Sequence, residues 1–176
     1  MTKYNPDIHH RRSVRIKGYD YSQAGLYFIT ICTQNRAHLF GEIENGVMIL
    51  NDAGRFAERC WLVIPEHYPE EELHEYVIMP NHVHGIVGVQ NVRVQNFEPL
   101  HLRQNQYQKI IPRSIGAIVR GFKIGITKWF QQNTTIHTAW QRNFYEHIIR
   151  DEKSHLNISE YIINNPMIWR EDRYYG

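Results

Sequence analysis

Two histidines with one residue between them form the most chemically suggestive pattern in this sequence. His82 and His84 lie in the apolar run from Met79 to Val87. Because side chains of a β-strand alternate between its faces, the two imidazoles are predicted to point the same way, and Val83 the opposite way. Two imidazoles on one face of a strand can provide half of the ligands of a divalent metal ion. A lone His-x-His pair is weak support, because solvated histidine pairs share this spacing.

A second group of polar side chains is predicted on a helix near the C-terminus. The sequence predicts this helix over residues 155–165, with Ser154 as its N-cap and Pro166 as its stop. Tyr161 and Asn165 are four residues apart, so the helix would present a phenol and a carboxamide on one face. Its packing stripe is predicted to consist of three aliphatic residues, Leu156, Ile158 and Ile162.

Several strands must position the two histidines. An aromatic and β-branched run predicts a central strand over residues 26–33, and Asn45-Gly46 predicts a hairpin within residues 42–50. Residues 73–79 and 82–89 are predicted as two adjacent antiparallel strands that meet at the Pro80-Asn81 corner.

Two helices are predicted before the C-terminal one. The first is capped by Asn51-Asp52 and runs to about Val63, with Pro65 as its stop. Its packing face is predicted to contain Phe56, Cys60 and Val63. The second helix spans residues 114–130, with apolar residues at helical spacing. Its basic side chains could line a nucleic-acid groove or could belong to an ordinary solvated face; they are Arg113, Arg120, Lys123 and Lys128.

Composition indicates one globular domain over residues 1–176. The chain is 42% hydrophobic and 22% charged, which excludes disordered and collagen-like proteins. No run is long enough to cross a bilayer and no segment resembles a signal peptide, so a cytoplasmic protein without membrane contact is expected. Cys32 and Cys60 lack metal or disulfide spacing and are interpreted as packing residues. Residues 90–108 are rich in Asn and Gln and are predicted to be a long polar connection.

Charge is distributed unevenly along the chain. Basic residues outnumber acidic ones in residues 1–41 and 100–176, whereas residues 42–76 are mostly acidic. Such a division is typical of proteins that hold phosphates, although two solvated faces would also explain it. The basic N-terminal arm (about residues 1–18) could contact DNA or could be a disordered tail. Its basic side chains near the domain are Arg11, Arg12, Arg15 and Lys17.

Four motifs occur together in an order that resembles a known family. They are Gly18-Tyr-Asp-Tyr21, Met79-Pro-Asn-His-Val-His84, the segment from Trp140 to Arg150, and Tyr161-Ile-Ile-Asn-Asn-Pro166. The combination resembles the REP-associated tyrosine transposases, a branch of the single-tyrosine HUH transposases, over nearly the whole chain. The resemblance implies an α+β fold, with a ferredoxin-like or RRM-like antiparallel sheet backed by helices. It also implies that the histidine motif lies on a central strand and the catalytic tyrosine on a C-terminal helix.

The resemblance also implies roles for individual residues. His82 and His84 match the metal-binding pair, for Mg²⁺ or Mn²⁺, and Tyr161 matches the nucleophile. Asn165 stands where related transposases place a glutamine as third metal ligand, and it offers the same carbonyl oxygen on a shorter arm. His147 matches a family histidine that would support the site, or it is a hydrogen-bonded structural histidine. Tyr145, beside Glu146 and His147, is a weaker candidate for the nucleophile.

The implied function is cleavage and transfer of single-stranded DNA beside a hairpin, through a covalent 5′-phosphotyrosine. The expected partner is hairpin DNA of the REP type, and the protein would be a monomer or a homodimer with the tyrosine acting in cis or in trans. Two other functions remain open: a non-catalytic module that binds hairpins, and a metal-dependent nuclease that uses water as nucleophile. A covalent protein–DNA adduct distinguishes the three.

Overall fold

The computed structural model describes residues 24–90 and 114–175. The predicted basic N-terminal arm, Arg113 and all of the predicted polar connection except Gln90 lie outside the described residues. In the part of the chain that is described, none of the helices combines the length and the apolar character needed to span a membrane.

Four antiparallel strands form the central sheet. They are β1 (Gly25–Cys32), β4 (Glu71–Ile78), β5 (His82–Val89) and β6 (Tyr145–Ile149), in the order β4-β5-β1-β6. The three strands predicted from the sequence are confirmed, including the antiparallel pair that meets at Pro80-Asn81. The edge strand β6 was not predicted, because its first three residues are polar or charged and the run is only five residues long.

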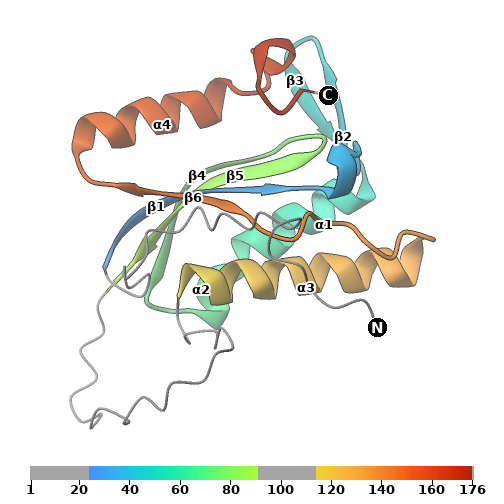
Figure 1. Ribbon diagram of the computed structural model, residues 1–176, viewed down its shortest axis with the longest axis horizontal. Helices are drawn as coiled ribbons and strands as arrows, with labels where there is room; N and C mark the ends of the chain where they lie inside the picture. The colour runs from blue at the N-terminus through green and yellow to red at the C-terminus, as the bar shows by residue number, and fades with distance from the viewer. Residues whose placement is uncertain (1–23, 91–113, 176) are drawn as a thin grey trace, which may run out of the picture.

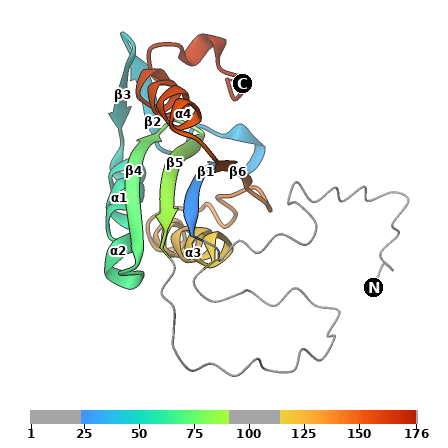
Figure 2. The same ribbon diagram turned by 90° about the vertical axis from the view of Figure 1, so that its left-hand side faces the viewer.

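The helices cover both faces of this sheet. α1 (Asp52–Leu62), the short α2 (Ile64–His67) and α3 (Ile115–Asn133) lie on one face, and α4 (Glu152–Asn164) lies across the other (Figures 1 and 2). The sheet strands and their connecting helices follow the β-α-β-β-α-β order of a split βαβ unit. These features confirm the α+β class with a four-stranded antiparallel sheet and helices.

A separate two-stranded hairpin confirms another prediction. β2 (Gly41–Glu44) pairs with β3 (Val47–Leu50), and Asn45 and Gly46 join them with φ angles of 50° and 79°. A tight two-residue hairpin turn of this type needs positive φ at both residues, and Asn and Gly adopt positive φ at low energetic cost.

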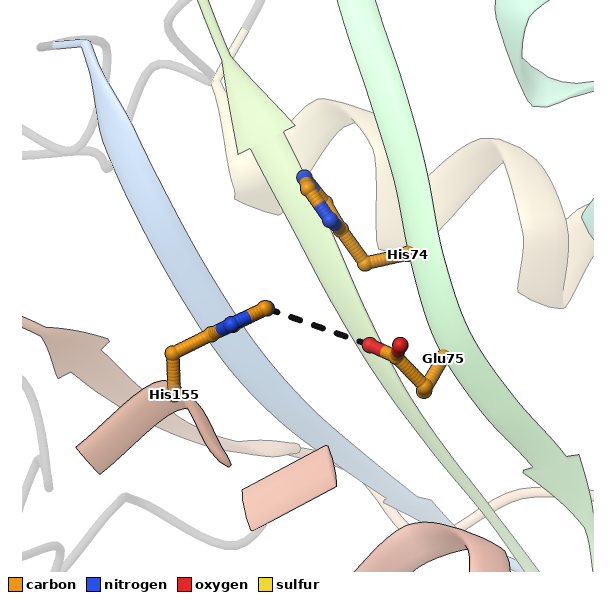
Figure 3. A group of neighbouring side chains, drawn as sticks. All are labelled: His74, Glu75 and His155. Atoms are coloured by element: carbon orange, nitrogen blue, oxygen red, sulfur yellow. Dashed lines mark ion pairs between the residues drawn. The ribbon is translucent and has the colours of Figure 1, made fainter. Parts of the chain in front are cut away.

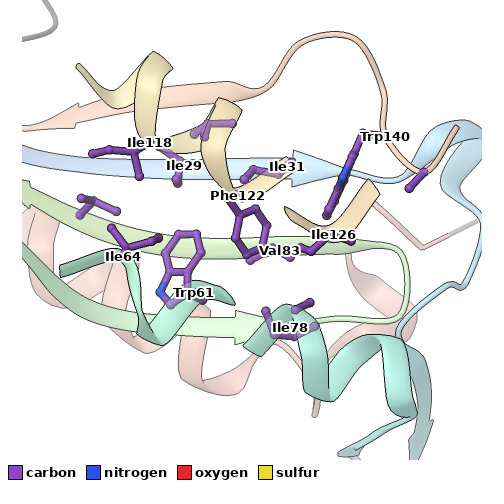
Figure 4. Close-up of a cluster of buried hydrophobic side chains, with 14 of the residues drawn as sticks. Ile29, Ile31, Trp61, Ile64, Ile78, Val83, Ile118, Phe122, Ile126 and Trp140 are labelled. Atoms are coloured by element: carbon purple, nitrogen blue, oxygen red, sulfur yellow. The ribbon is translucent and has the colours of Figure 1, made fainter. Parts of the chain in front are cut away.

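The main core lies between the sheet and helices α1 and α3 (Figure 4). Trp61 of α1 is fully buried there and meets Phe122 of α3 edge-on, with ring centroids 5.4 Å apart. The Trp61 ring also covers Gly85 of β5 so closely that a Cβ on Gly85 would lie 2.2 Å from Cζ2 of Trp61. Gly85 therefore allows α1 to pack directly on the strand that carries the two histidines.

Phe56 and Cys60 pack against the main core, as predicted, but they and Val63 are only partly buried. The fully buried positions of α1 are small residues and Trp61, which the prediction did not name. Small side chains bring the helix close to its neighbours: a Cβ on Gly54 would lie 2.1 Å from the carbonyl oxygen of Phe40. The predicted N-cap is confirmed, since the Asn51 side chain accepts a 2.9 Å hydrogen bond from the Gly54 amide. α1 ends at Leu62 with Val63 as its C-cap, as predicted, and Pro65 lies in the first turn of the separate short helix α2.

Helix α4 begins earlier than predicted. Its N-cap is Asp151, whose carboxylate accepts a hydrogen bond from the Ser154 amide, so Ser154 lies inside the first turn. Leu156 is 55% exposed and does not belong to the packing stripe. Ile162 is fully buried and Ile158 partly buried against Phe28 and Ile86 of the sheet. α4 ends at Asn164, close to the predicted stop.

Candidate active site and metal centre

The two histidines lie side by side on β5, a strand buried along its whole length. Both side chains are fully buried, and their ring centroids are 4.3 Å apart. Val83 points into the core on the opposite face. The shared orientation predicted from the strand alternation is confirmed, and the pair faces α4 and the segment that follows it.

Asn81 determines which nitrogen of His82 carries the proton. The Asn81 carboxamide donates through Nδ2 to the carbonyl of Tyr174, so its Oδ1, 2.8 Å from His82 Nδ1, must accept a hydrogen bond. His82 is therefore assigned as the Nδ1–H tautomer, and its Nε2 presents a lone pair.

His84 connects the sheet to Tyr161. Its Nδ1 lies 2.8 Å from the Thr30 hydroxyl on β1, and its Nε2 lies 3.2 Å from the Tyr161 hydroxyl on α4. The Tyr161 ring is half-buried, with its centroid 5.2 Å from that of His84. Tyr161 and the histidine pair therefore meet within one chain.

Asp172 is the site residue that sequence reasoning missed. Its Oδ2 accepts hydrogen bonds from the Tyr161 hydroxyl (2.7 Å) and from Asn165 Nδ2 (2.6 Å), and its Oδ1 accepts one from the Tyr174 amide. It follows Pro166 in a stretch without helical or strand periodicity, so no local pattern predicts that the chain returns to the histidines.

The donor set around the histidines fits a divalent cation. His82, His84 and Asp172 each offer a ligand atom within 4.8 Å of the others. Asn165 is fully buried, and because its Nδ2 donates to Asp172, its Oδ1 is left without a hydrogen bond. His82 Nε2 is likewise buried and without a hydrogen bond, although the Asn165 side chain is close enough to raise the pKa of His82. Asn165 Oδ1 and His82 Nε2 are thus two buried acceptors without a donor, and an amide oxygen and an imidazole nitrogen are both suitable ligands for a divalent metal ion.

Burial keeps both imidazoles in the neutral form that binds metals. It lowers the pKa of His82 to about 4, against the opposing effect of the Asp172 carboxylate. Burial, together with the neighbouring His82, lowers the pKa of His84 well below its usual value. Burial and the hydrogen bond to Asp172 raise the pKa of Tyr161. Burial also acts to raise the pKa of Asp172, but the hydrogen bonds from Tyr161, Tyr174 and Asn165 outweigh it and lower that pKa.

An open cleft of about 560 Å³ leads to the Tyr161 ring. Tyr145, His147 and Arg173 contribute to its walls. His147 is exposed on β6, and Arg173 places its guanidinium carbon 5.3 Å from the centre of the Tyr145 ring. The Tyr161 hydroxyl contacts His84 directly, whereas the Tyr145 ring meets Phe28 edge-on.

The basic residues predicted to contact DNA are dispersed. Arg120 and Lys128 are exposed on α3, which covers the face of the sheet opposite Tyr161. Lys123 is half-buried, and its ammonium donates to the carbonyls of Gln141 and Asn143, so it supports the segment before β6. Burial lowers the pKa of Lys123 to about 8. Arg11, Arg12, Arg15, Lys17 and Arg113 lie outside the described residues.

Comparison with known proteins gives two relatives, both from Haemophilus influenzae. An uncharacterized protein is 52% identical over 176 residues, which cover 99% of this chain and 98% of the relative. A second protein, named as a candidate REP-associated tyrosine transposase, is 28% identical over 148 residues, which cover 84% of this chain and 73% of the relative. No family model matches the chain.

The fold also resembles that of a solved structure. A REP-associated tyrosine transposase bound to a REP hairpin matches 95% of this chain and 73% of its own chain, with a TM-score of 0.57 and 20% identity. At this level of identity the similarity concerns the fold.

Proposed function

The chain is homologous to REP-associated tyrosine transposases, and we propose that it cleaves and rejoins single-stranded DNA beside a hairpin, with Tyr161 as its nucleophile. The observation that carries the proposal is the contact of the Tyr161 hydroxyl with His84 Nε2, at 3.2 Å, beside two buried acceptors that fit a cation. A nucleophile and a metal-ligand set thus share one site within one chain.

Three side chains would hold the metal ion in this proposal. His82 and His84 bind through their Nε2 atoms, because their Nδ1 atoms are engaged by Asn81 and Thr30. Asn165 provides its Oδ1, turned toward the site by the hydrogen bond from its Nδ2 to Asp172. Bound Mg²⁺ or Mn²⁺ supplies Lewis-acid stabilisation of the charge that develops on the scissile phosphate.

Asp172 positions the nucleophile. Its carboxylate accepts the hydrogen bond of the Tyr161 hydroxyl, which directs the phenol oxygen and its proton. The phenol oxygen forms a bond to phosphorus while the bond from phosphorus to the 3′ oxygen breaks. The phenol proton passes to Asp172, and the departing 3′ oxygen takes up a proton from water to become a free hydroxyl. The product is a 5′-phosphotyrosine, which a different 3′-hydroxyl can attack in the reverse step.

The cleft beside Tyr161 is the proposed path of the single strand. Arg173 offers an exposed guanidinium for a phosphate, and Tyr145 offers an aromatic face for a base. His147 lies on the same wall, where it can contact the strand without binding the metal. The homologous fold bound to a REP hairpin supports hairpin DNA as the partner.

The test uses hairpin oligonucleotides taken from repeats that flank the gene, incubated with the protein and Mn²⁺ or Mg²⁺. Each oligonucleotide is labelled at either its 5′ or its 3′ end. The 3′ label is expected to migrate with the denatured protein, because the tyrosine bonds to the 5′ phosphate of the downstream fragment. The 5′ label is expected on a shorter, free strand.

Two tyrosine variants make the result specific. Tyr161→Phe should abolish both products while retaining hairpin binding, and Tyr68→Phe, on the opposite face of the sheet, should retain both products. Cleavage without a protein-linked label would replace the proposal with a water-using nuclease. Binding without cleavage in any metal would replace it with a hairpin-binding module.

A further inference from the structure

A second group of metal-binding side chains lies away from Tyr161. His74 and Glu75 of β4 point toward His155 of α4, as Figure 3 shows. Each of the three offers a ligand atom within 4.8 Å of the others. None of them takes part in the proposed cleavage.

A bulge in β4 brings two consecutive side chains to the same face. Leu73 pairs with Val87 and Tyr76 with Gly85, so two residues of β4 lie opposite one residue of β5. Leu73 and Tyr76 both pack against the core on the α1 side. His74 and Glu75, between them, both project toward α4, which a regular strand would not allow.

Helix α4 completes the cluster with two residues one turn apart. His155 places its Nε2 3.8 Å from Glu75 Oε2, and Ser159 donates a 2.9 Å hydrogen bond to the same oxygen. The His74 and His155 rings meet edge-on with centroids 5.4 Å apart. Ser159 therefore orients the carboxylate between two imidazoles.

The histidines have unused nitrogen atoms. Nε2 of His74 and Nε2 of His155 are both buried, and neither makes a hydrogen bond. The side chains of His155 and Glu75 are 25% and 36% exposed, so the cluster opens to solvent on one side.

We propose that His74, Glu75 and His155 form a second divalent-metal site, of the zinc type, that joins α4 to β4. Two imidazoles and one carboxylate are a donor set that Zn²⁺ takes in open sites, where the fourth position holds water. This ion would be bound at the first half of α4, whereas the ion proposed beside Tyr161 would be bound near the end of the helix. Its effect is to hold the helix that carries Tyr161 on the sheet.

Apolar packing attaches α4 to the sheet mainly at one end of the helix. Ile162 is the one fully buried aliphatic side chain of α4, and it lies at the Tyr161 end. The His155 end has Leu156 exposed to solvent. A metal at this end would supply the attachment that apolar packing does not.

The experiment measures zinc stoichiometry by equilibrium dialysis and elemental analysis. The His82→Ala/His84→Ala variant removes the first pair of ligands, and it should still bind one Zn²⁺. Adding His155→Gln should eliminate that ion, whereas adding His137→Gln, an exposed histidine elsewhere, should leave it. In the otherwise unchanged protein, His155→Gln should lower the stoichiometry by one ion, which keeps the test valid if the double variant does not fold.

A second readout follows the helix itself. Zinc at about a hundredfold its Kd should raise the Tm of the double variant by roughly 5 to 10 °C and slow amide exchange in α4. His155→Gln should eliminate both effects. Zinc stoichiometry that is the same with and without His155→Gln would overturn the proposal and leave the cluster as an ion pair with a neighbouring histidine.

Discussion

The hydroxyl of Tyr161 donates a 2.7 Å hydrogen bond to Asp172, a residue eleven positions further along the same chain. The acceptor oxygen also holds the Asn165 carboxamide. One carboxylate thus positions the proposed nucleophile and a proposed metal ligand together. Changes at Asp172 should therefore alter the chemistry of Tyr161 before they alter the fold.

Asp172→Asn should lower the pKa of Tyr161. Burial and the hydrogen bond to the Asp172 carboxylate raise that pKa, and the amide removes the negative charge that opposes phenolate formation. The measurement is an ultraviolet pH titration of tyrosinate, with Tyr161→Phe used to assign the signal. Glu171→Gln removes a neighbouring exposed charge and should leave the titration unchanged. An identical Tyr161 pKa in Asp172→Asn would contradict the assigned contact.

The metal-free protein should lose stability as the pH falls from about 6.5 to about 4. The pKa of His82 is about 4 in the folded chain and about 6.5 when unfolded, so the unfolded state binds the extra proton in this window. The stability that His82 contributes is complete above pH 6.5, and its loss amounts to about 3 kcal/mol. Urea unfolding at several pH values measures it. His82→Gln should make this dependence less steep, and the slope that remains belongs to His84, whose pKa burial also lowers. An equally steep curve in the variant would contradict the contribution of His82.

Asn165→Ala should weaken Mn²⁺ binding by roughly tenfold or more, because the variant loses a proposed ligand oxygen. Asn164→Ala alters an exposed neighbour at the end of α4 and is the matched control. Electron paramagnetic resonance of free Mn²⁺ gives both affinities. If the two variants bind Mn²⁺ equally well, the third ligand is Asp172 rather than Asn165.

Gly85→Ala should destabilise the protein by about 1–3 kcal/mol or more, because the added Cβ would meet the Trp61 ring at 2.2 Å. Gly121→Ala is the control: the added Cβ would lie 3.8 Å from the Tyr68 hydroxyl, in ordinary contact on an exposed part of α3. That change should stabilise the helix by up to about 1 kcal/mol. Denaturant unfolding compares the two. Equal stabilities would show that α1 can move away from β5 at little cost.

The sequence predicts best where a local pattern decides the structure. Alternation determines the orientation of His82 and His84, and the Asn-Gly turn determines the β2–β3 hairpin. The packing face of α1 depends on how closely its backbone approaches Phe40, which no periodicity expresses. The spacing of apolar residues therefore predicted Phe56 and Cys60, which pack against the core, but not the small residues that the helix buries most deeply.

Only part of the candidate site could be predicted from the sequence. The histidine pair and Tyr161 could be named from spacing and resemblance, but Asp172 depends on a return of the chain after Pro166. The bulge that turns both His74 and Glu75 toward α4 is equally invisible in the sequence, because strict alternation would send them to opposite faces.

The carboxamide of Asn81 links an early part of the chain to a late one. It touches His82 with one end and the backbone of Tyr174 with the other, across more than ninety residues of chain. During synthesis His82 and His84 leave the ribosome long before Tyr161, Asn165 and Tyr174 do. A nascent chain that has made only the sheet therefore has two imidazoles without their partners, and the proposed metal centre would be completed only late in synthesis.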